Sequence, residues 1–192
     1  MMLGLNSGIK KLSEINIALC ILLISAVFIL GPSSFIMNGI IQNIGSYLQN
    51  FLSLATWSET YSNTTWQNSW TLFYYSWWFA WSPFVGLFIA RVSYGRTIKE
   101  FILGVVFVPS IMVFIWMGTF GNAAIFQEFF TDINLSDSIN ADISIALFSF
   151  LEQFPLSKIL MGLSLLIIVT FFVTSSDSVS YTHLTLPTIY SV

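Results

Sequence analysis

The sequence predicts an all-α integral membrane fold with four transmembrane helices and one surface amphipathic helix. Hydrophobic residues make up 56% of the 192-residue chain and charged residues only 8%, and the mean hydropathy is +0.81. A soluble domain carries roughly 25% charged residues, so this chain cannot build a water-facing surface. The composition therefore excludes a soluble enzyme. Six Lys or Arg against nine Asp or Glu exclude a nucleic-acid-binding protein as well.

Long runs without charge define the predicted spans. A membrane-spanning helix needs about 20 mostly apolar residues, and four segments reach or approach that length. The expected spans cover residues 12–32, 70–92, 100–120 and 156–176. Basic residues precede the first span and fill the link between the second and third, whereas the link before the fourth is acidic. The positive-inside rule then places the first two regions in the cytoplasm and the acidic link outside.

Residues 35–55 differ from the four spans. Apolar residues recur there at helical spacing with Asn, Gln and Ser among them, after the helix-breaking pair Gly31-Pro32. We interpret this segment as an amphipathic helix on the outer surface that packs across the ends of other helices. Its polar face has no Lys or Arg, which argues against direct binding to lipid head groups.

The second span is unusually aromatic. At 100° per residue, Trp70, Trp77, Trp81 and Phe88 lie within about 40° of one another on one face of the helix. Tryptophans in the middle of a span favour contact with a quaternary ammonium, because the face of an indole attracts a cation that cannot donate a hydrogen bond. Packing against other helices remains the alternative. Pro83 cannot donate to the carbonyl of Phe79, which predicts a free acceptor and a kink there.

From Trp70 to Phe101 the chain resembles the betaine/carnitine/choline transporter family. The segments that carry the resemblance read WWFAWSPFVG at residues 77–86 and FIARVSYGRTIKEF at residues 88–101. Gly31-Pro32, the segment GTFG at residues 118–121 and the segment TSSDS at residues 174–178 extend it. The resemblance covers most of residues 8–178.

The resemblance implies a secondary transporter built from two inverted repeats of five helices each. The four spans would match helices seven to ten, so residues 1–178 would form a partial transporter domain and the chain would be a fragment. Residues 179–192 depart from the family pattern, and we expect a non-native tail there. The family also implies a multi-pass protein of the bacterial inner (plasma) membrane and a homotrimer.

The resemblance assigns site residues on the second span. Trp78 matches a tryptophan of the aromatic box around a trimethylammonium group, and Trp77 is its neighbour at the same level. Trp81 and Phe88 match aromatic residues that line the transport pathway. The resemblance implies that the other walls of the box come from a helix of the first repeat, which this chain lacks. We therefore expect transport of glycine betaine, carnitine or choline by the parent protein and little activity from the fragment alone.

Thr174 and Ser175 match hydroxyls that resemble a sodium site in sodium-coupled members of the family. Hydroxyl oxygens suit a small hard cation, so sodium is the one coupling ion that the sequence suggests, and no other cofactor is expected. Capping of a helix end is the alternative role for these two residues. Two other functions also stay open, namely a fragment of an inverted-repeat symporter for amino acids or organic cations, and a membrane module without transport activity.

Overall fold

The computed structural model describes residues 3–62 and 64–184, which form helices and connecting turns without a β-strand. The long helices are α1 (Leu3–Leu30), α2 (Ser33–Ala55), α3 (Phe73–Val92), α5 (Val108–Phe130) and α8 (Ser157–Leu184). The short helices are α4 (Ile98–Ile102), α6 (Leu135–Ala141) and α7 (Ala146–Glu152). Two 3-10 turns cover Glu59–Tyr61 and Ile143–Ile145, and two π-helical segments cover Asn68–Leu72 and Leu103–Phe107.

Three helical stretches in the described residues are long and apolar enough to cross a membrane. They are Lys10–Leu30, Ile98–Phe130 and Ser157–Ser176, which correspond to the first, third and fourth predicted spans. Helix α3 has 20 residues but is not among them. Its Trp and Tyr side chains, each with a polar group on a large ring, lower its mean hydropathy. An all-helical membrane fold is thus confirmed, while the passage of α3 through the bilayer stays a prediction.

The third apolar stretch is longer than expected. It begins near the predicted start, where Thr97 caps α4: its hydroxyl accepts from the Glu100 amide at 3.3 Å, and the Thr97 amide donates to the Glu100 carboxylate at 2.9 Å. It then continues ten residues beyond the predicted end at residue 120. Some polar side chains near its far end are bonded within the protein, although the buried side-chain oxygen of Gln127 has no partner among the described residues. Glu128, for example, accepts from the amide of Leu135 at 2.7 Å at the start of α6.

The segment that the sequence suggested as an acidic outer link contains α6 and α7, which the sequence analysis did not predict. Helix α8 continues to Leu184, so residues 179–184 extend the last helix. Residues 185–192, the rest of the predicted non-native tail, lie outside the described residues.

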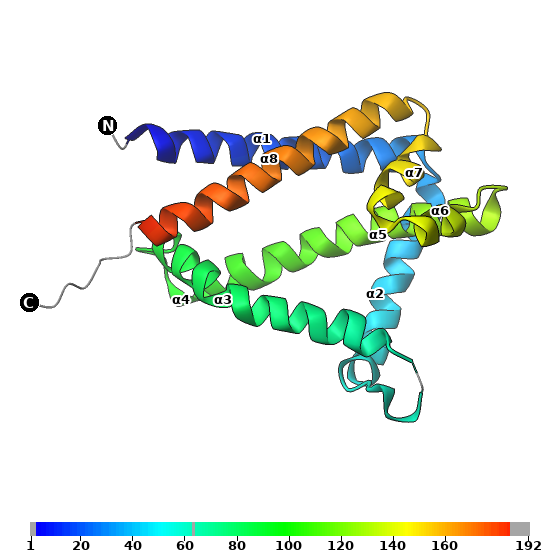
Figure 1. Ribbon diagram of the computed structural model, residues 1–192, viewed down its shortest axis with the longest axis horizontal. Coiled ribbons are helices and arrows are strands. Elements are labelled where there is room, and N and C mark those ends of the chain that lie inside the picture. The colour runs from blue at the N-terminus through cyan, green and yellow to red at the C-terminus, as the bar shows by residue number, and fades with distance from the viewer. Residues whose placement is uncertain (1–2, 63, 185–192) are drawn as a thin grey trace, which may run out of the picture.

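The long helices pack in pairs (Figure 1). Helix α1 lies against α8, α2 lies against α5, and α3 contacts α8. The core gathers where α1, α5, α7 and α8 meet, and its fully buried members include Leu23, Val27, Ala123 and Leu151. Described side chains of α3 are all at least partly exposed, including those of its aromatic face. The aromatic helix therefore borders the packed core and leaves its rings accessible.

The contact between α2 and α5 depends on close approach of the two backbones. A Cβ atom at Gly39 would lie 2.5 Å from the side chain of Asn122, and one at Gly118 would lie 2.7 Å from Ile40. The buried Asn122 amide donates to the Gly118 carbonyl at 2.6 Å and accepts from Asn43 at 3.2 Å. Helix α2, predicted as an amphipathic surface helix over residues 35–55, is thus fixed to a span through its polar face.

Candidate functional site

An aromatic ladder runs from the π-helical segment Asn68–Leu72 along α3. Trp70 stacks on Tyr74 with ring centroids 6.0 Å apart, Tyr74 meets Trp77 edge to face at 6.2 Å, and Trp77 stacks on Trp81 at 5.9 Å. The residues follow one another at spacings of three and four, which place successive side chains on one helix face. The predicted stripe is therefore present from Trp70 to Trp81, with Tyr74 as an additional member.

The helix is continuous through Pro83, and a neighbouring hydroxyl takes the place of the missing amide donor. Pro83 has no N–H to offer the Phe79 carbonyl four residues earlier. The hydroxyl of Ser82 donates to that same carbonyl at 3.0 Å. The free acceptor expected from the sequence is thus satisfied within the helix.

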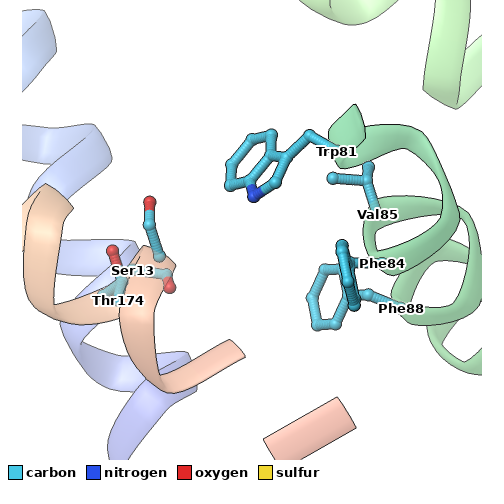
Figure 2. A pocket seen from close by; sticks show the side chains of 7 residues that line it. Ser13, Trp81, Phe84, Val85, Phe88 and Thr174 are labelled. Carbon is cyan, nitrogen blue, oxygen red and sulfur yellow. The ribbon is translucent and has the colours of Figure 1, made fainter. Parts of the chain in front are cut away.

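The foot of the ladder opens into a pocket between three helices. The pocket has a volume of about 300 Å³ and is lined by Ser13 of α1, Trp81, Phe84, Val85 and Phe88 of α3, and Thr174 and Ser175 of α8. Figure 2 shows the α3 side chains on one side and the side chains of Ser13 and Thr174 opposite them. The pocket thus has one aromatic, apolar wall and one hydroxyl-bearing wall.

The structure brings together four of the six predicted site residues. Trp81, Phe88, Thr174 and Ser175 line this one pocket, and Trp77 joins it indirectly by stacking on Trp81. Trp78 lies elsewhere. Its ring is 69% exposed and lines a separate pocket of about 350 Å³ with Tyr74 and Tyr75. Consecutive helical residues differ by 100° in direction, so Trp77 and Trp78 cannot face the same space.

Hydrogen bonds hold the hydroxyl wall in place. The buried Thr174 hydroxyl lies 3.0 Å from the Thr170 carbonyl and 2.9 Å from the Phe171 carbonyl, so it caps carbonyls of its own helix. One turn earlier, the Thr170 hydroxyl lies 3.1 Å from the amide oxygen of the buried Asn16. This contact links α8 to α1.

Ser13, Phe84 and Val85 line the pocket but were not among the predicted site residues. The signal for Ser13 was its spacing from Asn16. Two polar residues three positions apart near the start of an apolar helix share a face, and the structure turns that face toward α8. No cluster of three or more His, Cys, Asp or Glu side chains able to hold a metal ion occurs within the described residues.

The fold and the pocket define a class of protein: an all-helical, multi-pass membrane protein with a partly aromatic pocket between its helices. The model of the betaine/carnitine/choline family of transporters matches residues 1–188, a range that includes ten residues of the expected tail. The chain belongs to this transporter family. Its relatives are bacterial transporters and not enzymes. Together with the apolar helices of membrane-spanning length, this makes it a multi-pass protein of the bacterial plasma membrane.

Named relatives align over nearly the whole chain. The ectoine/hydroxyectoine transporter of Virgibacillus pantothenticus is 42% identical over 93% of this chain and 36% of its own length. The glycine betaine transporter of Acinetobacter baylyi is 43% identical over 92% of this chain and 27% of its own length. The glycine betaine/proline/choline transporter of Vibrio parahaemolyticus is 42% identical over 91% and 31%, respectively. The chain thus spans about a third of the length of these relatives.

Proposed function

We propose that the chain is part of a secondary transporter that carries quaternary-ammonium compounds such as glycine betaine, carnitine or choline. The observation that carries this proposal is the pocket between α3 and α8, where aromatic rings face hydroxyl groups. Its volume of about 300 Å³ is within the range of small-molecule sites. Family membership and the names of the relatives support transport and the substrate class.

The ladder suits a cation without N–H groups. A methylated ammonium gains about 0.5–2 kcal/mol from each ring that it contacts, with the larger values in dry sites. Trp81 and Phe88 would receive such a group at the pocket, and Trp77 supports Trp81 from behind. Rings stacked every turn of α3 also offer successive contacts of similar strength, as a pathway requires.

Trp78 is proposed as one wall of the aromatic box, separate from the pocket at the foot of the ladder. Its exposed ring, with Tyr74 and Tyr75 beside it, forms an open surface on α3. A single helix cannot enclose a cation, so the remaining walls would come from helices outside this chain. We therefore expect weak binding and no transport by the chain alone. For the whole transporter we also propose a homotrimer and coupling by symport, as the family resemblance implies.

Sodium is proposed as the coupling ion, with Thr174 and Ser175 among its ligands. Both residues line the hydroxyl wall of the pocket, and hydroxyl and carbonyl oxygens are suitable ligands for a hard cation. The capping bonds of Thr174 are compatible with this role, because a donating hydroxyl oxygen still carries lone pairs.

A chimera provides the test. This chain would replace the matching segment of the Acinetobacter baylyi glycine betaine transporter, and uptake of radiolabelled glycine betaine would be measured in liposomes with and without a sodium gradient. We expect uptake by the chimera, about tenfold lower uptake after Trp78→Ala, and competition by choline or carnitine but not by alanine.

Trp57→Ala is the matched control, because Trp57 lies in the loop before α3 and packs on Trp66 with centroids 5.4 Å apart. This variant should transport like the unmodified chimera. A Trp78→Ala chimera with undiminished uptake would remove Trp78 from the binding site. Uptake inhibited by alanine as strongly as by choline would favour an amino-acid symporter.

A further inference from the structure

We infer that Ser13 of α1 contacts the substrate and binds its oxygen-bearing end, so that it selects zwitterions such as glycine betaine over simple methylated cations. This inference rests on the proposed function, because it assigns a specificity-determining residue to the same pocket. It adds α1 to the site, which the sequence assigned only to α3 and α8.

The two walls of the pocket differ in chemistry: one is aromatic and the other bears hydroxyl groups. The rings of Trp81, Phe84 and Phe88 come from α3, and the hydroxyls of Ser13 and Thr174 come from α1 and α8 (Figure 2). Ser175 of α8 adds a third hydroxyl. A compound with a methylated ammonium at one end and a carboxylate at the other matches such a pair of walls. The ammonium would contact the rings, and the carboxylate requires hydrogen-bond donors on the opposite side.

Ser13 is better placed as a donor than Thr174. The Thr174 hydroxyl is directed to the carbonyls of Thr170 and Phe171 in its own helix. The half-buried hydroxyl of Ser13 has no hydrogen-bond partner among the described residues. A carboxylate entering the pocket would therefore find in Ser13 a donor whose hydrogen is not yet committed.

The position of Ser13 is fixed by the packing of α1 on α8. Asn16 lies one turn further along α1 and is buried, and its side-chain oxygen lies 3.1 Å from the Thr170 hydroxyl of α8. Because the two helices run antiparallel, the turn of α1 before Asn16 lies beside the turn of α8 after Thr170. This register places Ser13 opposite Thr174 and Ser175 and holds the donor in the pocket before a substrate arrives.

The test uses the purified chain in detergent micelles and two probes that share a methylated ammonium. Glycine betaine carries a carboxylate, and tetramethylammonium carries none. Saturation-transfer NMR on the N-methyl signal reports binding even at millimolar dissociation constants. Ser13→Ala should weaken glycine betaine binding about tenfold, the value of one hydrogen bond to a charged group, and leave tetramethylammonium binding unchanged. Ser13→Thr, which keeps the hydroxyl, should retain most of the affinity for glycine betaine.

Ser25→Ala is the matched control, since Ser25 lies on α1 outside the pocket and is exposed. It should bind both probes normally. Equal weakening of both probes by Ser13→Ala, or no change in either, would overturn the role of Ser13. An effect that appears only when sodium replaces potassium would overturn it too and assign Ser13 to an ion site. If the unmodified chain binds neither probe while correctly folded, the pocket is not a binding site and the role of Ser13 is overturned. The proposal of transport is tested separately by uptake through the chimera.

Discussion

The contact between α2 and α5 predicts a specific effect of one methyl group. Gly39→Ala would place a Cβ atom 2.5 Å from the Cγ and Oδ1 atoms of Asn122. Real Cβ atoms essentially never come this close to another heavy atom, so Asn122 must move. Its side chain holds the Gly118 carbonyl at 2.6 Å and accepts from Asn43 at 3.2 Å. Both hydrogen bonds are disturbed when the amide is displaced.

The expected change in the free energy of unfolding follows from those two hydrogen bonds and from the burial of Asn122. Each hydrogen bond contributes about 0.5–1.5 kcal/mol net, and a buried polar group left without a partner costs about 1–3 kcal/mol. Alanine is favoured over glycine within a helix by about 1 kcal/mol, which opposes the loss. We therefore expect Gly39→Ala to lower the free energy of unfolding by about 2 kcal/mol. Gly45→Ala on the same helix should raise it, because no atom lies within 4 Å of the added Cβ.

The assay is reversible unfolding in mixed detergent micelles, followed by tryptophan fluorescence and circular dichroism. Repeating the measurement in an Asn122→Ala chain shows whether the clash with Asn122 causes the loss of stability. In an Asn122→Ala chain the obstructing side chain is gone, so Gly39→Ala should then cost nothing or stabilise. An equal cost in both backgrounds would show that the close approach of α2 to Asn122 is not what Gly39 provides, and would refute the reasoning.

Two further predictions concern single hydrogen bonds. Ser82→Ala removes the donor that satisfies the Phe79 carbonyl and should lower the free energy of unfolding by about 0.5–1.5 kcal/mol in the same assay. Ser82→Thr keeps the hydroxyl and should not lower it. An equal decrease in both variants would exclude the hydroxyl as the cause. The Asp142 carboxylate accepts from the Ser144 amide at 2.9 Å, which lowers the pKa of Asp142. Since the folded pKa lies below the unfolded one, the stabilisation is present above the unfolded pKa and lost as the pH falls through the folded pKa. Hydrogen exchange of the Ser144 amide, corrected for the intrinsic rate, should thus lose protection in acid, and Asp142→Asn should abolish this pH dependence.

The sequence predicted the apolar helices well because composition and length alone decide which segments suit a bilayer. It also predicted the ring stripe of α3, since helical periodicity fixes which side chains share a face. It underestimated the stretch that ends at Phe130, where Asn122 and Glu128 would interrupt a span unless other segments bond them. The partner of Asn122 comes from α2 and is remote in the sequence, whereas the partner of Glu128 is the start of α6, a short helix that the sequence did not predict.

For the candidate site too, the sequence predicted what helical periodicity determines and missed what depends on packing between helices. Trp81 and Phe88 could be placed on one face by counting residues. Their position opposite Thr174 depends on how α3 packs against α8, which no local pattern encodes. Ser13 was missed for the same reason, because its spacing from Asn16 indicates only a shared face of α1 and does not show which helix that face meets.

The hydrogen bond between Asn16 and Thr170 has a consequence for biosynthesis. Its partners are 154 residues apart in the sequence, and a ribosome adding about 5–20 residues per second needs roughly 8–30 s to cover that distance. During this interval Asn16 has been made but Thr170 does not yet exist. Until then the amide oxygen of Asn16 is bonded to another group, such as water, and α1 pairs with α8 only after α2 to α7 have been synthesised.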